Sequence, residues 1–213
     1  MPAFAPIAVC SVAVAGLLLA ERHDSERGIW LAKPLASLSF IWMALASGAT
    51  QSSYGRLILV ALILCLAGDL LLIPRRRPGA FRAGVLAFLL GHLAYAAGFM
   101  TQPLAWSGLA IGAALLALVV FAVLHWLGRS LPADMVWPVR AYLVVIAVMS
   151  VLACGVTAAG GPPYVAAGAL AFTASDISVA RDRFLRHEFL NRAWGLPLYY
   201  AAQLLLASTP ALI

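Results

Sequence analysis

Eight apolar runs, each long enough to cross a lipid bilayer as a helix, occupy almost the whole of this sequence. The hydrocarbon core of a bilayer is about 30 Å thick, so a spanning helix needs roughly 20 residues. The runs cover residues 3–20, 29–47, 57–73, 80–100, 104–127, 136–158, 163–180 and 193–211. They leave no room for a soluble domain. We therefore expect an all-α protein, with a single integral membrane domain over residues 1–213 built as a polytopic transmembrane bundle of eight helices.

The amino-acid composition favours the same class. Of the 213 residues, 64% are hydrophobic and only 10% are charged, whereas soluble domains carry about 25% charged residues. The net charge of +6 comes from short connections between the runs, where membrane topology accounts for it, and no motif indicates nucleic-acid binding. Cys10, Cys65 and Cys154 lie inside apolar runs without disulfide or metal-ligand spacing, so we expect them to be packing residues. No basic residue precedes the first run, which favours a transmembrane helix over a cleaved signal peptide.

Basic residues predict the orientation of the bundle. All but one of the fourteen lie in or beside the connections that follow the first, third, fifth and seventh runs: Arg22, Arg27, Lys33, Arg75, Arg76, Arg77, Arg82, Arg129, Arg140, Arg181, Arg183, Arg186 and Arg192. The opposite side holds Arg56 alone. Because cytoplasmic loops are enriched in Lys and Arg, we expect these connections in the cytoplasm and both termini on the non-cytoplasmic side. The three arginines at 75–77 are then topology determinants, with contact to lipid phosphate as the alternative.

Two carboxylates stand inside apolar runs. Asp69 lies six residues before the cluster that starts at Arg75, or roughly 9 Å below the membrane surface at 1.5 Å per helical residue. Asp176 stands in a similar position before Arg181. A charged side chain costs roughly 2.5–3.5 kcal/mol at the centre of a span and less near the interface, and such residues usually have a function. We therefore expect both carboxylates to be functional and to lie at matching depth on the cytoplasmic side.

An offset of 107 positions separates Asp69 from Asp176, and the same offset separates Lys33 from Arg140. It is half the chain length and would fit two parallel four-helix repeats related by an axis along the membrane normal. The similarity between the two halves is thin beyond these positions.

The other polar residues suited to chemistry also fall in the cytoplasmic halves of the predicted helices. They are Lys33, His92, Tyr95, Arg140, Tyr142, Tyr199, Tyr200 and Gln203. His92 and Tyr95 share a face with small residues of their helix, and Tyr199 and Gln203 are one turn apart. Three of these residues have structural alternatives: Tyr142 as an interfacial anchor, His92 as a hydrogen-bond partner between helices, and Lys33 as a side chain that reaches the headgroups.

Two carboxylates that face one cavity suit two functions. They can act as acid and base in hydrolysis through an oxocarbenium-like state, as in glycosidases, or as a proton relay in a transporter or lipid-binding protein. A scaffold protein is a third possibility, in which neither aspartate matters beyond folding. The outer halves of the predicted helices are almost wholly apolar, which favours an enzyme with access from one side. The sequence does not assign the roles of acid and base.

Six short motifs in order resemble the YhhN/TMEM86 family of eight-span membrane proteins, which includes lysoplasmalogenases. They are K-P-L at 33–35, A-G-D at 67–69, G-H-x-x-Y at 91–95, Tyr142 with Met149 downstream, S-D at 175–176, and L-P-L-Y-Y-x-x-Q at 196–203. The resemblance covers roughly residues 29–207. The order of the six motifs along the chain makes the resemblance specific.

The resemblance implies hydrolysis of the vinyl ether bond of a lysoplasmalogen, which releases a fatty aldehyde and glycerophosphoethanolamine or glycerophosphocholine. It implies Asp69 and Asp176 as the catalytic residues. It also implies a substrate pocket lined by Lys33, His92, Tyr95, Arg140, Tyr142, Tyr199, Tyr200 and Gln203, in which Lys33 and Arg140 hold the phosphate. No metal or cofactor is expected, and the partners are a lysophospholipid in the membrane and water. We expect the inner membrane of a bacterial cell, with the cavity toward the cytoplasm.

Overall fold

A computed structural model describes residues 4–74, 77–128 and 130–213, and within these ranges the chain is helical with no strand. The helices are α1 (Phe4–Arg22), α2 (Glu26–Ala46), α3 (Ser53–Leu71), α4 (Pro78–Met100), α5 (Trp106–Leu127), α6 (Val136–Ala158), α7 (Pro163–Phe184) and α8 (Phe189–Ser208). Two short 3₁₀ helices, η1 (Ala133–Met135) and η2 (Thr209–Ala211), precede α6 and follow α8. The predicted all-α class and eight helices are confirmed.

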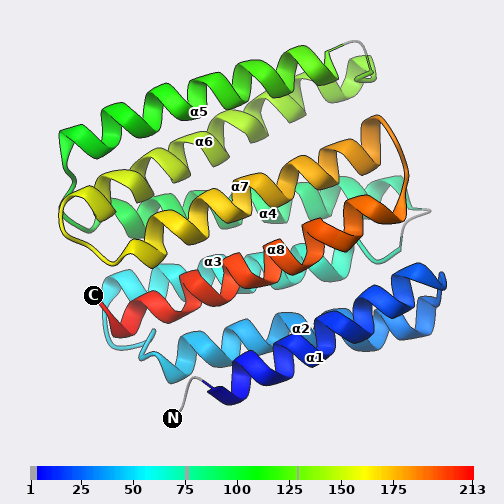
Figure 1. The fold of residues 1–213 in the computed structure, drawn as a ribbon, viewed down its shortest axis with the longest axis horizontal. Helices are drawn as coiled ribbons and strands as arrows, with labels where there is room; N and C mark the ends of the chain where they lie inside the picture. Colours follow the sequence, from blue (N-terminus) through cyan, green and yellow to red (C-terminus); the bar gives the residue numbers. More distant parts are fainter. Residues whose placement is uncertain (1–3, 75–76, 129) are drawn as a thin grey trace.

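The eight helices lie side by side and alternate in direction (Figure 1). Consecutive helices form the hairpins α1–α2, α3–α4, α5–α6 and α7–α8. These four hairpins turn at the same end of the bundle, which we call the basic end, while α1 begins and α8 ends at the opposite end (Figure 1). The described basic residues other than Arg56 lie on the basic-end halves of their helices or in the turns there. Arg75, Arg76 and Arg129 lie outside the described residues. That the basic end faces the cytoplasm remains a prediction.

Six of the helices, α1 to α6, are long and apolar enough to cross a membrane. Helices α7 and α8 are as long but do not meet the same measure of apolarity. The reason is visible in their buried polar residues, among them Ser175 and Ser178 on α7 and Asn191 and Gln203 on α8. These side chains face the interior of the bundle, where they lower the hydropathy without facing lipid.

The helix ends follow local chemistry more closely than hydropathy. Ser25 and Ser52 cap α2 and α3, accepting hydrogen bonds from the backbone N–H groups of Gly28 and Gly55. Because of the Ser52 cap, α3 begins at residue 53, four residues before its apolar run. Helix α7 continues to residue 184, past the apolar run that ends at 180, and the backbone N–H of Leu185 still donates to the Arg181 carbonyl. An apolar run marks the part of a helix that can lie in lipid, whereas backbone hydrogen bonds and caps determine where the helix begins and ends.

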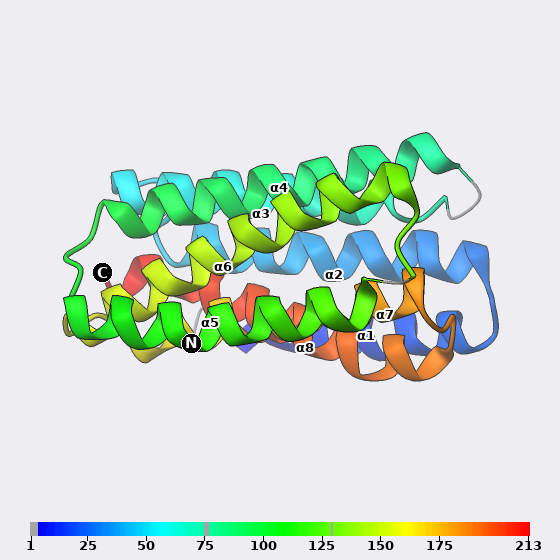
Figure 2. The ribbon, with the colours of Figure 1, turned by 90° about the horizontal axis from the view of Figure 1, so that it is seen from above.

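Helix α8 packs against α7, α2, α1 and α3, so it lies within the bundle. Among the described residues, α5 makes extensive contact with α6 alone and runs along the outside of the bundle, with α6 crossing it obliquely (Figure 2). The helices α5 and α6 approach most closely away from the basic end, where Gly108 and Gly112 lie against Cys154. Toward the basic end the two helices diverge (Figure 2).

Candidate active site

A cavity of about 400 Å³ lies in the basic half of the bundle. Its apolar walls come from stripes at helical spacing on three helices: Phe81, Val85 and Phe88 on α4, Leu116, Val119, Val120, Val123 and Leu127 on α5, and Val139, Leu143, Ile146 and Ala147 on α6. Its polar lining includes Lys33, Asp69, Tyr142, Ser175, Asp176 and Tyr199. A volume in this range and a mostly apolar lining with few polar groups are typical of a small-molecule site.

Asp69 is surrounded by hydrogen-bond donors. The Lys33 ammonium lies 3.3 Å from Oδ1, and the hydroxyls of Ser37 and Tyr199 each donate a hydrogen bond of 2.8 Å to Oδ2. Only 3% of the Asp69 side chain is exposed. The site is built from α2, where Lys33 and Ser37 are one turn apart, from the last turn of α3, and from the middle of α8. A buried carboxylate with a cation and two hydroxyl donors is well compensated as an anion.

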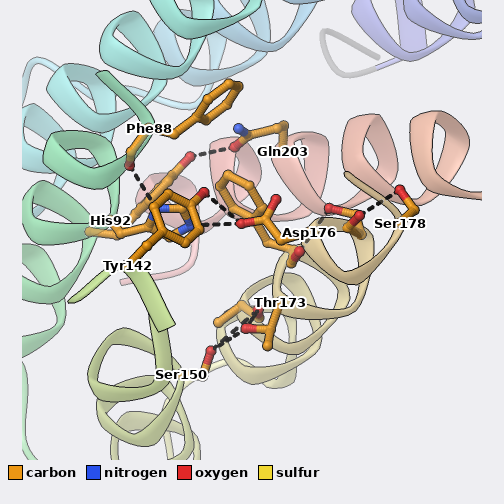
Figure 3. Close-up of polar contacts among 12 residues, drawn as sticks. Phe88, His92, Tyr142, Ser150, Thr173, Asp176, Ser178 and Gln203 are labelled. Atoms are coloured by element: carbon orange, nitrogen blue, oxygen red, sulfur yellow. Dashed lines mark hydrogen bonds and ion pairs between the residues drawn. The ribbon is translucent and has the colours of Figure 1, made fainter. Parts of the chain in front are cut away.

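Asp176 has a different environment. The Tyr142 hydroxyl donates a hydrogen bond of 2.6 Å to Oδ2, and Nε2 of His92 lies 3.8 Å from the same oxygen (Figure 3). Within the described part of the chain, no Lys or Arg forms an ion pair with Asp176. The two carboxylates of the cavity therefore differ sharply: Lys33 compensates Asp69, whereas no cation in the described ranges pairs with Asp176.

His92 is fully buried on α4 between Phe172, with ring centroids 4.5 Å apart, and Tyr142 at 5.2 Å. Its Nδ1 lies 2.6 Å from the carbonyl oxygen of Phe88 (Figure 3). A carbonyl oxygen only accepts, so Nδ1 carries the hydrogen. Nε2 of the neutral ring is then a bare acceptor, and among the described residues it has no hydrogen-bond partner.

A second layer of polar residues lies behind the cavity. Tyr95 donates a hydrogen bond of 2.6 Å to the Gln203 side-chain oxygen (Figure 3), and Tyr200 lies 3.2 Å from the hydroxyl of Ser37. All four side chains are buried. Since Ser37 in turn binds Asp69, this layer fixes the groups that line the cavity.

Comparison with known proteins identifies the family of the chain. The model of the YhhN family matches residues 28–209. The chain belongs to the YhhN family. It is 35% identical over 175 residues to lysoplasmalogenase TMEM86B of Homo sapiens, a match that covers 81% of this chain and 69% of the relative. It is 34% identical over 157 residues to lysoplasmalogenase TMEM86A of Bos taurus, covering 70% and 63%. No solved structure matches the chain.

The family confirms the resemblance seen in the sequence motifs, and together with the apolar helices it makes the chain an integral membrane protein. In this YhhN protein the residues expected at the site fall into three groups. Lys33, Asp69, Tyr142, Asp176 and Tyr199 line the cavity. His92, Tyr95, Tyr200 and Gln203 lie behind it, buried.

Arg140 forms the third group. It is exposed on α6, with its guanidinium 5.4 Å from the ring of Trp137, and it is not among the residues that line the cavity. Lys33, which stands 107 positions earlier, is instead buried against Asp69. The two positions therefore differ in environment, and the internal repeat that they suggested remains a prediction.

Several residues of the site were not predicted from the sequence. Ser37 could have been found, because it follows Lys33 by one helical turn. A charged cluster at the start of α8 was harder to foresee: Arg192 lies 3.5 Å from Glu21 and 3.1 Å from Asp182, and all three line the cavity. In the sequence these charges look like ordinary loop residues.

Proposed function

We propose that this protein is a lysoplasmalogenase that hydrolyses the vinyl ether bond of a lysoplasmalogen within the membrane. The observation that carries the proposal is the pair of carboxylates on one cavity: Lys33 compensates one, and the other forms no ion pair with a described Lys or Arg. The names of the relatives support the same activity. The products are a fatty aldehyde and a glycerophosphoethanolamine or glycerophosphocholine.

Vinyl ether hydrolysis requires a proton on carbon. The acid donates its proton to the β-carbon of the C=C bond, which leaves an oxocarbenium ion at the carbon bound to oxygen. Water adds to that carbon and loses a proton, which gives a hemiacetal. The hemiacetal then divides into the aldehyde and the free hydroxyl of the glycerol. One group must hold a proton, and another must stabilise the positive charge.

Asp176 is the proton donor in this proposal. Its polar contacts are a hydroxyl donor and a bare histidine nitrogen, so no Lys or Arg of the described ranges offsets a negative charge there. A carboxyl group in such a place is suited to carry a proton. After the transfer, the Tyr142 hydroxyl stabilises the new carboxylate, and the attacking water returns a proton to it.

Asp69 is the group that stabilises the cation. The ammonium of Lys33 and the hydroxyls of Ser37 and Tyr199 keep it ionised and fix its position. A fixed negative charge in a water-poor cavity stabilises an oxocarbenium ion more strongly than it would in water. This division of roles matches the general pattern of two carboxylates whose surroundings differ.

The two parts of the cavity wall suit the two parts of a lysophospholipid. The apolar stripes of α5 and α6 would contact the alkenyl chain. The cluster of Arg192 with Glu21 and Asp182, near the end of α7 and the start of α8, would meet the zwitterionic headgroup. We further propose that all eight helices cross the membrane, with the basic end in the cytoplasm of a bacterial cell.

The test is aldehyde release by the purified protein in detergent from a vinyl ether lysophospholipid, with the matching acyl lysophospholipid as control. We expect aldehyde from the vinyl ether lipid and no fatty acid from the acyl lipid. Asp69→Asn and Asp176→Asn should each remove essentially all turnover, because the groups act as a unit. A folded wild-type protein that releases no aldehyde would contradict the proposal and favour a proton-coupled transporter, to be tested by proton flux in liposomes.

A further inference from the structure

His92 lies beside Asp176 but does not touch the cavity. Its ring is fully buried, and a histidine that only joined α4 to a neighbouring helix would need one hydrogen bond to do so. Instead, the bond of Nδ1 is made to the carbonyl of Phe88 on its own helix, one turn earlier (Figure 3). This bond connects no second helix. Its effect is to fix the tautomer and the direction of the ring.

The fixed tautomer points a lone pair at the carboxyl group of Asp176. Nε2 has no hydrogen in this tautomer and lies 3.8 Å from Oδ2, with no other partner among the described residues. A bare Nε2 on a fully buried ring would face an ionised carboxylate of Asp176 as a second acceptor, with no hydrogen between the two atoms. Such an arrangement is costly, since a buried acceptor without a donor loses the hydrogen bond that water would otherwise give it. A proton on Asp176 removes the conflict.

We propose that His92 is a positioning residue that keeps the catalytic proton on Asp176. This rests on the proposed function, in which Asp176 is the acid. In the resting site the Asp176 O–H faces Nε2 across 3.8 Å, and we expect the two atoms to close to hydrogen-bond distance once substrate fills the cavity. When the O–H bond breaks, a C–H bond forms at the β-carbon of the substrate. The water that adds to the oxocarbenium ion restores the proton to Asp176, so His92 ends the cycle unchanged.

The neighbours of His92 support a neutral ring. Phe172 and Tyr142 lie against it from α7 and α6, and neither carries a cation or an anion. The ionisable group that faces it is Asp176, which is uncharged while it holds the proton. Asp69, on α3, is paired with Lys33 and is therefore compensated. An orienting partner of this kind, which acts through a catalytic group, affects turnover more than substrate binding.

The first test is nitrogen NMR of the protein labelled with ¹⁵N-histidine in detergent. The chain has four histidines, and His23, His125 and His187 are exposed, which gives three internal references. We expect the His92 signals, assigned by their loss in His92→Gln, to show a hydrogen on Nδ1 and none on Nε2 at neutral pH. A hydrogen on Nε2 would overturn the proposal. This result does not depend on activity.

The second test compares turnover of two His92 variants. His92→Leu removes the acceptor, and His92→Gln restores one near the position of Nε2. We expect kcat for aldehyde release to fall about a hundredfold in His92→Leu and about tenfold in His92→Gln, with KM within about twofold, since acid catalysis as a whole contributes roughly 10²–10⁴-fold. Phe99→Leu, which alters a buried ring on the same helix, should keep kcat within about threefold.

The outcomes separate the two proposals. Wild-type turnover in His92→Leu would overturn the role of His92 and leave the lysoplasmalogenase proposal intact. Equal loss in His92→Leu, His92→Gln and Phe99→Leu would indicate a packing role only and would also overturn it. If the wild-type protein releases no aldehyde, the proposed function fails, and the NMR experiment still decides the tautomer.

Discussion

Lys33 on α2 and Asp69 on α3 form a buried ion pair, with Nζ and Oδ1 3.3 Å apart and side chains 11% and 3% exposed. In a segment surrounded by lipid, each charge is tolerated because the other is present. Because the Lys33 ammonium replaces the solvation that water would give, Asp69 can stay ionised in a buried site.

Breaking this pair on one side should destabilise the protein strongly. We expect Lys33→Met to lower the free energy of unfolding by about 3–5 kcal/mol, because it leaves an uncompensated buried charge. Lys33→Met combined with Asp69→Asn should recover most of that loss. The matched control is Arg82→Met, which breaks the exposed pair with Asp134 and should cost about 0–1 kcal/mol. Thermal unfolding in detergent measures all three, and a double variant no more stable than Lys33→Met would contradict the account.

Tyr142 should affect catalysis without holding the fold together. Its hydroxyl donates a 2.6 Å hydrogen bond to Asp176 and so stabilises the carboxylate that forms after proton transfer. We expect Tyr142→Phe to lower kcat by about tenfold to a hundredfold, near the lower end of what the loss of one stabilising donor costs. The control is Tyr164→Phe. Tyr164 is 47% exposed and lies at the start of α7, away from Asp176 on the same helix, so this variant should retain normal turnover. Full activity of Tyr142→Phe would remove this bond from the mechanism.

Gly195 sets the approach of α8 to α7. A Cβ atom at this position would overlap the side chain of Ser178, whereas one at Gly16 on α1 would meet nothing within 4 Å. We expect Gly195→Ala to lower the midpoint of thermal unfolding by several degrees, as overpacking typically costs roughly 1–3 kcal/mol. Gly16→Ala should leave it unchanged or raise it slightly. Equal midpoints for the two variants would show that α7 and α8 are less closely packed than described.

The crossing of α7 can be tested by labelling single cysteines. Tyr164 lies at the start of α7 and His187 follows its end, and both are exposed. We expect a membrane-impermeant thiol reagent to label Tyr164→Cys in intact cells and His187→Cys only after the membrane is opened. The buried or half-buried native cysteines should remain unlabelled, which the parent protein controls. Labelling of both positions from the same side would contradict a crossing by α7.

The sequence predicted the helices well because apolar length is a property of each segment alone. It also indicated that Asp69 and Asp176 lie on the same side of the bundle, since both precede arginines at similar spacing. The structure brings both to one cavity. Of the eight spans predicted from hydropathy, α7 and α8 do not meet the measure that the other six meet, because the polar residues that build the site lower their hydropathy.

The residues that contact each carboxylate could not be predicted from the sequence. Periodicity gives the face on which a residue lies, but not the neighbouring helix that this face meets. Thus Lys33 and Arg140 looked equivalent, yet one is buried against Asp69 and the other is exposed on Trp137. Tyr199 and Tyr200 are adjacent in sequence, and the rotation of α8 alone decides that Tyr199 binds Asp69. The tautomer of His92 depends on a single backbone carbonyl.

The central claim is that this protein protonates the β-carbon of a vinyl ether. The most direct measurement is the mass of the aldehyde released from a vinyl ether lysophospholipid in D₂O, trapped at once by borohydride reduction. We expect one deuterium at the carbon next to the former carbonyl carbon, and no product from Asp176→Asn. Aldehyde without deuterium at that carbon would contradict the account, and so would undiminished product from Asp176→Asn.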